Sequence, residues 1–100
     1  MLKVVIIDDE YIVREGLINI ISWRDYGLEV VGEAENGEDG LLLAEQLKPD
    51  IIITDIYMPK MDGLDLIKAI REKKIDAEVI ILSGYGEFSY AKQAIKNGVS

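Results

Sequence analysis

Four short runs of apolar, mostly β-branched residues constrain this chain more than any other feature of its sequence. They lie at residues 4–7, 29–34, 51–54 and 79–82, and the second is the weakest because polar residues flank it. Apolar runs that do not alternate with polar residues are typical of strands buried on both faces of a sheet. The runs therefore predict four buried strands.

Helical patterns fill the segments between and after these runs, with apolar residues spaced three and four apart. The predicted stripes are Val13, Leu17, Ile20 and Ile21; Gly40, Leu43, Ala44 and Leu47; Gly63, Leu66, Ile67 and Ile70; and Phe88, Ala91 and Ile95. Asn36 and Gly37 suit a cap or turn before the second helix, and Leu42 falls off its stripe. Strands that alternate with helices predict an α/β fold with right-handed crossovers. We expect a doubly wound, flavodoxin-like parallel sheet with strand order 2-1-3-4.

A sheet of this kind usually has a fifth strand followed by a helix. The sequence stops at Val99 and Ser100, where that strand would begin. We therefore expect residues 1–100 to form one domain that is incomplete at its carboxyl end, as a piece of a longer protein. An open fourth strand and an uncovered apolar face would favour a dimer or a swapped assembly.

Composition excludes several kinds of chemistry. The chain has no cysteine and no histidine, so disulfides, structural zinc sites and Ser-His-Asp or Cys-His nucleophiles are ruled out. Nineteen acidic residues against eleven basic give a net charge of −8, which disfavours binding to nucleic acid or an anionic membrane. No apolar stretch reaches the roughly 18 residues of a transmembrane helix, and no signal peptide is evident, so we expect a cytoplasmic protein.

Polar residues follow three of the four predicted strands. Asp8, Asp9 and Glu10 end the first, Asp55 ends the third and Ser83 ends the fourth. Functional groups of open parallel sheets gather at the carboxyl ends of the strands, so Asp8, Asp9 and Asp55 should share one pocket. Carboxylates packed together attract a cation, and oxygen ligands suit Mg²⁺ or Mn²⁺. We interpret Glu10 as a solvated cap of the following helix.

An Asp carboxylate at such a site can accept a phosphoryl group and form an acyl phosphate. A metal ion would neutralise and orient the incoming oxygens. The hydroxyl of Ser83 and the backbone amide after it could hold the transferred group. The sequence thus predicts phosphoryl transfer to Asp55.

Three segments resemble the receiver domain of two-component response regulators. They are IIDDE at residues 6–10, ITDIYMPKMDG at 53–63 and ILSGY at 81–85. The resemblance runs from end to end of the chain, and the paired acids and the D-x-x-M-P-x-M-D-G run are highly specific. Residues 22–23, 26–27 and 83–88 further resemble a subgroup attached to arabinose-regulator-type DNA-binding domains.

The resemblance implies a role for each matching residue. Asp55 would accept the phosphoryl group from a phosphohistidine of a sensor kinase, and Ser83 would contact that group. Asp9, Asp55 and the backbone carbonyl of Tyr57 would bind Mg²⁺ directly, and Asp8 would help through water. Within these 100 residues the family's fifth-strand lysine and switch aromatic have no counterpart. The switch would control transcription through a DNA-binding domain outside this chain.

Two other functions fit a parallel sheet with acids at one edge. A Mg²⁺-dependent phosphatase with an Asp nucleophile needs a second acid two residues further on, and Tyr57 holds that position. A flavin-binding electron carrier needs a phosphate loop after the first strand, where this chain has acids. We therefore expect a phosphoacceptor switch that could dephosphorylate itself, and not a dedicated enzyme.

Overall fold

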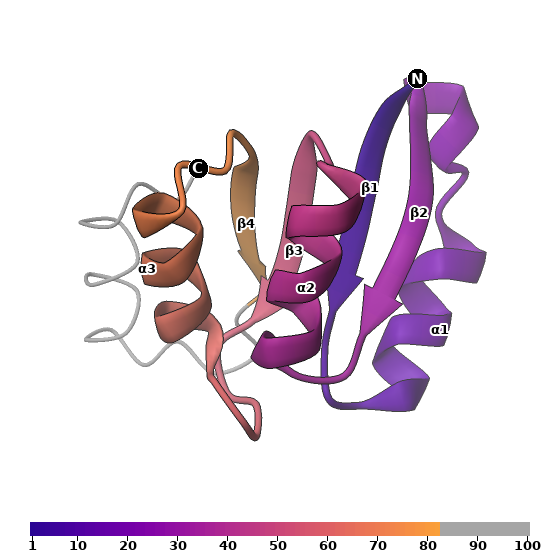
Figure 1. Ribbon diagram of the computed structural model, residues 1–100. Helices are drawn as coiled ribbons and strands as arrows, with labels where there is room; N and C mark the ends of the chain where they lie inside the picture. Colours follow the sequence, from indigo (N-terminus) through magenta and orange to yellow (C-terminus); the bar gives the residue numbers. More distant parts are fainter. Residues whose placement is uncertain (83–100) are drawn as a thin grey trace.

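A single parallel sheet organises the molecule, with strand order β2-β1-β3-β4 (Figure 1). The computed structural model describes residues 1–82. Its strands are β1 (Leu2–Ile7), β2 (Leu28–Ala34), β3 (Ile51–Asp55) and β4 (Glu78–Leu82). The predicted fold class and strand order are confirmed. Ser83 and the predicted fourth helix lie outside the described residues.

Helices cover both faces of this sheet. They are α1 (Tyr11–Ile20), the short 3-10 helix η1 (Trp23–Tyr26), α2 (Gly37–Leu47) and α3 (Gly63–Glu72). Figure 1 shows α2 and α3 side by side on one face and α1 beside β2 on the other. No helix among residues 1–82 is long and apolar enough to cross a membrane.

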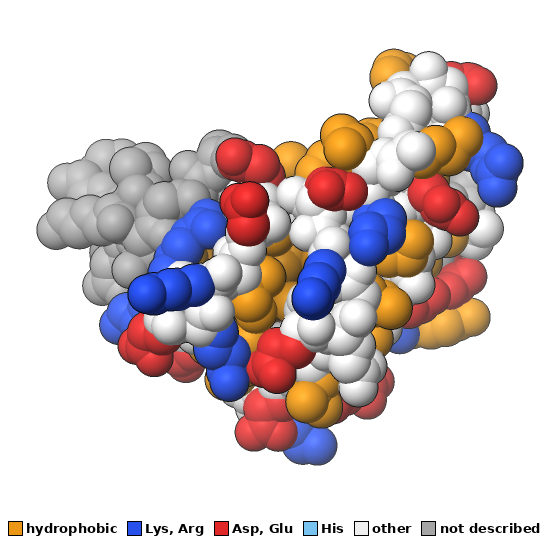
Figure 2. Space-filling view, turned by 45° about the horizontal axis from the view of Figure 1, so that its top comes forward, with side chains coloured by type: hydrophobic (Ala, Val, Ile, Leu, Met, Phe, Trp, Pro, Cys, Tyr) orange, Lys and Arg blue, Asp and Glu red, His pale blue; other side chains and the backbone are white. Residues whose placement is uncertain are grey.

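The core has two parts because successive residues of a strand point to opposite faces. Val5, Ile7 and Ile52 belong to the cluster beneath α2 and α3, whereas Val4 and Ile6 belong to the cluster beneath α1. A salt bridge of 3.4 Å between Lys73 Nζ and Glu45 Oε1 links the residue that follows α3 to α2 at the surface. On this side of the molecule, acidic and basic side chains are spread over the surface and apolar ones show between them (Figure 2).

Two of the predicted helical stripes match the structure. The α2 stripe is buried or half-buried, the α3 stripe is fully buried, and Leu42 is exposed as expected. Asn36 caps α2, since its Oδ1 accepts a hydrogen bond of 2.8 Å from the backbone N–H of Asp39.

The stripe predicted for α1 is only partly confirmed. Leu17 packs on the sheet as predicted, together with Ile18, whereas Val13 and Ile20 are 37% and 82% exposed. The buried position on this face one turn earlier is held by Arg14, which bonds with groups at the ends of β1 and β2. Apolar periodicity ignores such a polar anchor, and this is why Val13 was predicted in its place.

Candidate functional site

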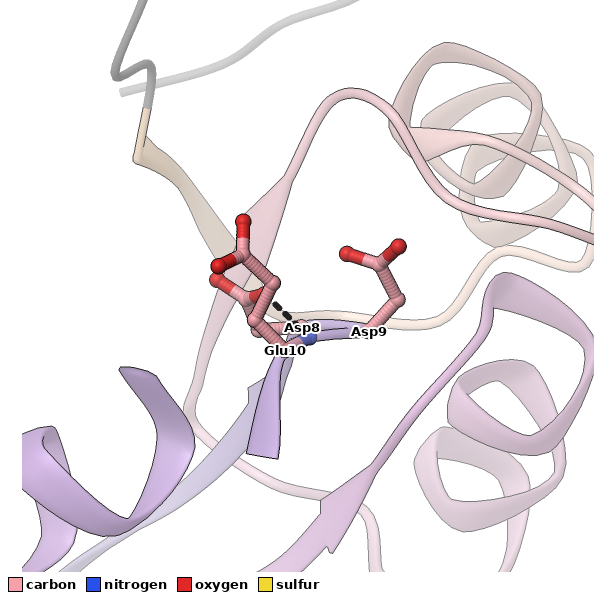
Figure 3. A group of neighbouring side chains, drawn as sticks. All are labelled: Asp8, Asp9 and Glu10. Atoms are coloured by element: carbon pink, nitrogen blue, oxygen red, sulfur yellow. Dashed lines mark hydrogen bonds between the residues drawn. The ribbon is translucent and has the colours of Figure 1, made fainter. Parts of the chain in front are cut away.

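Three acids occupy the turn that leads from β1 into α1. Asp8 is almost fully buried, whereas Asp9 and Glu10 are exposed. One carboxylate oxygen from each lies within 4.8 Å of the others. Figure 3 shows the three carboxylates projecting from the end of β1, together with the hydrogen bond between Asp8 and Glu10. This bond of 2.9 Å runs from the backbone N–H of Glu10 to Oδ1 of Asp8.

Backbone pairing brings Asp55 to the same edge of the sheet. In the β1–β3 register Ile7 pairs with Thr54, so Asp8 and Asp55 each follow the last paired residue of their strand. The backbone N–H of Ile56 donates a hydrogen bond of 2.8 Å to Oδ1 of Asp55. The amide that follows Asp55 in the chain therefore helps to orient its carboxylate.

The start of α3 closes tightly against Asp55. Gly63 donates a hydrogen bond of 2.7 Å from its backbone N–H to the carbonyl of Ile56. A Cβ atom at Gly63 would lie only 2.4 Å from the carbonyl oxygen of Asp55, so only glycine fits there. Asp62 starts the helix, since its Oδ1 accepts a bond of 2.9 Å from the backbone N–H of Asp65. Gly63 is thus the first residue of α3, and Asp62 is its cap.

Burial and mutual repulsion raise the pKa values of two of the acids, Asp8 and Asp55. Burial, followed by the charges of Asp55 and Asp9, raises the pKa of Asp8, and the Glu10 amide and Arg14 oppose this rise. Burial also raises the pKa of Asp55; the charges of Asp9 and Glu10 add to the rise, and the Ile56 amide opposes it. These mutual effects mean that the carboxylates from β1 and β3 form one electrostatic unit.

The sequence predictions for this edge have mixed outcomes. Asp8, Asp9 and Asp55 lie at one end of the sheet, as the topology requires. Glu10 is the N-cap residue of α1 and is exposed, as the sequence predicts, although its side chain makes no cap hydrogen bond. Its carboxylate also lies close to those of Asp8 and Asp9, since the turn into α1 brings all three together. The metal-binding role of the Tyr57 carbonyl stays a prediction.

A desolvated carboxylate beside two exposed ones makes a concentrated set of oxygen ligands. Bringing like charges together is unfavourable unless a proton or a cation compensates. Hard divalent cations such as Mg²⁺ prefer oxygen ligands of this kind and bind through a few carboxylates plus water. The donor set therefore fits the Mg²⁺ or Mn²⁺ that the sequence predicts.

Sequence reasoning missed Arg14, whose side chain reaches this edge of the sheet. Its guanidinium donates to the backbone carbonyl of Asp8 at 2.6 Å and forms a salt bridge of 2.9 Å with Glu33. The signal was available, because Arg14 lies three and four residues before Leu17 and Ile18, on the helix face that packs on the sheet. It was overlooked since the helical stripe was drawn through apolar residues alone.

Comparison with known proteins points to one family. Residues 4–100 match the family described as the response regulator receiver domain. The chain is 43% identical over 99 residues to the transcriptional regulatory protein YesN of Bacillus subtilis, covering 99% of this chain and 27% of YesN. It therefore spans well under two thirds of that relative.

Solved structures agree with the sequence matches. The receiver domain of AraT, a response regulator from Geobacillus stearothermophilus, superposes with a TM-score of 0.91 at 47% identity, covering 99% of this chain and 77% of that one. One chain of the crystal structure of a CheX–CheY complex with BeF₃ and Mg²⁺ from Borrelia burgdorferi superposes on this chain with a TM-score of 0.88 at 29% identity. That match covers 99% of this chain and 74% of the other.

Proposed function

The chain belongs to the response regulator receiver domain family, and we propose that Asp55 is the residue that accepts the phosphoryl group. Receiver domains are phosphoacceptor switches of two-component signal transduction. The observation that carries the assignment is the position of Asp55 at the end of β3, which pairs with β1 in the sheet. The Ile56 amide holds its carboxylate there, and the charges of Asp9 and Glu10 raise its pKa. We further propose that residues 1–100 act as one receiver domain.

The proposed reaction moves one phosphoryl group from a sensor histidine kinase. A carboxylate oxygen of Asp55 attacks the phosphorus of a phosphohistidine, the P–N bond breaks, and the imidazole leaves with the electron pair and takes up a proton. The product is an acyl phosphate on Asp55. The phosphoryl group brings about −1.5 to −2 charges to this position. The acids beside Asp55 therefore oppose its transfer unless a bound cation compensates for the added charge.

We propose Mg²⁺ as the cofactor, with Mn²⁺ as a substitute. Asp9, Asp55 and the backbone carbonyl of Tyr57 would bind it directly and Asp8 through water. When bound, the ion neutralises the phosphoryl oxygens and orients the group for in-line transfer. Support comes from Asp8 and Asp9, which lie in one carboxylate cluster with Glu10, and from the effect of Asp9 on the pKa of Asp55. The similar structure from a CheX–CheY complex with Mg²⁺ and BeF₃ adds to it. Ser83, outside the described residues, would contact the phosphoryl group.

The output of the switch would act on transcription. YesN is a transcriptional regulatory protein, and this chain matches 27% of its length. We propose that phosphorylation here controls a DNA-binding domain elsewhere in the same protein, in the cytoplasm. The receiver domain itself, with a net charge of −8, would not bind the nucleic acid.

Phosphorylation by a small donor tests the assignment of Asp55. The protein is incubated with acetyl phosphate and Mg²⁺, and its intact mass is measured. We expect one added phosphoryl group on the wild type and on Asp25→Asn, a control at an exposed aspartate of η1, and none on Asp55→Ala. A labelled Asp55→Ala variant, or an unlabelled wild type, would contradict the proposal. Many turnovers without a labelled species would favour a phosphatase instead.

A further inference from the structure

We propose that Arg14 is a positioning residue that sets the geometry of the divalent-cation site by holding the peptide between Asp8 and Asp9. The inference rests on the proposed function, because it assigns a role toward the metal ion of that same site. It concerns a side chain that supplies no ligand itself. A guanidinium carries a positive charge, so electrostatics alone would make it a hindrance to cation binding.

Arg14 is buried by three different contacts. Its Nε lies 2.9 Å from Oε1 of Glu33 at the end of β2, and one terminal nitrogen donates to the Asp8 carbonyl at 2.6 Å. The guanidinium carbon lies 5.7 Å from the centre of the Tyr11 ring. A planar group with several donors is needed to bond two acceptors on different strands while stacking on a ring. Lysine has the charge but lacks this shape.

These contacts complete the immobilisation of Asp8. Its backbone N–H donates to the carbonyl of Ala34 at 3.0 Å, and its carboxylate accepts from the backbone N–H of Glu10 at 2.9 Å. Its carbonyl is the acceptor for Arg14. That carbonyl belongs to the peptide bond between Asp8 and Asp9. By holding it, Arg14 fixes the orientation of this peptide and thereby the backbone position from which the Asp9 side chain extends.

The same arginine ties the site to the edge strand. Glu33 is held by Arg14, and the neighbouring Ala34 is held by the Asp8 amide. Backbone and side-chain hydrogen bonds thus both connect the end of β1 to the end of β2. Metal sites commonly depend on such outer partners, whose loss weakens metal affinity by about 10- to 100-fold.

Two substitutions separate positioning from charge. Arg14→Lys keeps the positive charge but cannot reach both acceptors, whereas Arg14→Met removes the charge and keeps an apolar stem. If Arg14 acted only through its charge, Arg14→Met would bind a cation more tightly and Arg14→Lys would be unchanged. If it positions the acids, both variants should bind more weakly despite their different charges. The two explanations therefore predict opposite signs for Arg14→Met.

The measurement is a titration with Mn²⁺ alone, followed by electron paramagnetic resonance of the free ion. We expect about tenfold weaker binding for both Arg14 variants, with wild-type affinity for Arg24→Met, a control at an exposed arginine of η1. Wild-type or tighter binding by Arg14→Met would overturn the inference while leaving the proposed function intact. A wild type that binds no Mn²⁺ would instead overturn the proposed metal site, and the inference with it.

A milder variant guards against loss of the fold. Glu33→Gln keeps an acceptor for Arg14 but removes the ion pair, and urea unfolding monitored by circular dichroism reports the stability of every variant. We expect Glu33→Gln to weaken Mn²⁺ binding less than Arg14→Lys, and the double variant to be no weaker than Arg14→Lys alone. Additive losses in the double variant would show that Glu33 and Arg14 act separately, which would overturn the proposed coupling to β2.

Discussion

Helices α1 and α3 have the same length of ten residues but bind to the sheet in different ways. Helix α3 buries the stripe Gly63, Leu64, Leu66, Ile67 and Ile70 and begins at the side-chain cap Asp62. Among the described residues of α1 only Arg14 is buried, and its first residue follows an acid that makes no cap bond. The difference indicates that α3 supplies much of the stability of the face that it shares with α2. Helix α1, on the other face of the sheet, is oriented by the polar contacts of Arg14 beside the candidate site.

Removing a core side chain should give the largest difference between the two helices. Ile67→Ala in α3 should lower the free energy of unfolding by about 2–5 kcal/mol, because Ile67 is fully buried and a cavity would remain. Ile12→Ala in α1 should change it by less than about 0.5 kcal/mol, because Ile12 is 83% exposed. Urea unfolding measures both values, and comparable losses would mean that α1 packs as α3 does.

Adding one methyl group should have opposite signs in the two helices. Gly63→Ala places a Cβ atom 2.4 Å from the backbone oxygen of Asp55, so the start of α3 must shift at a cost of about 1–3 kcal/mol. Gly16→Ala meets only the end of Ile20 at 4.0 Å and should stabilise α1 by about 0.5–1 kcal/mol. Thermal unfolding distinguishes the two directions. The Gly63 variant should also accept phosphate from acetyl phosphate more slowly, and unchanged labelling would mean that Asp55 tolerates the shift.

The first turns of the two helices should respond differently to the loss of an acid. Asp62→Ala removes the bond to the Asp65 amide and should lower the free energy of unfolding by about 1 kcal/mol. Glu10→Ala removes no cap bond and should have a smaller effect on stability. Chemical unfolding of both variants in EDTA tests this contrast, and a larger loss for Glu10→Ala would mean that the Glu10 side chain stabilises α1 more than the cap bond of Asp62 stabilises α3.

The same contrast explains what the sequence could predict. Apolar runs and the geometry of parallel sheets predict the strand order and the position of Asp8 and Asp55 at the same edge of the sheet. The apolar periodicity also predicts the buried stripes of α2 and α3. The orientation of α1 does not follow from it, because it depends on hydrogen bonds from Arg14 to groups distant in the sequence. Periodicity detects burial of apolar surface, and it cannot detect a charged side chain whose partners come from other strands.

The smallest effect should come from Asp8, which follows β1 in the turn that leads to α1, and its sign should be the reverse of that for Asp62. Burial raises the pKa of Asp8, so the folded state holds this proton more tightly than the unfolded chain does. The resulting stability is present below the ordinary Asp pKa of 3.8 and is lost as the pH rises through the raised value. Near pH 7 without divalent cations, ionised Asp8 therefore costs stability.

Asp8→Asn, which keeps an oxygen for the Glu10 amide, should consequently unfold at a higher urea concentration than the wild type in EDTA at about pH 7. The gain should shrink as the pH is lowered, because the wild type then becomes protonated and resembles the variant. Added Mg²⁺ should reverse the ranking, since the ion stabilises only a protein that binds it. A gain that persisted in acid would show that a cause other than the ionisation of Asp8 lowers the stability of the wild type, which would contradict this prediction.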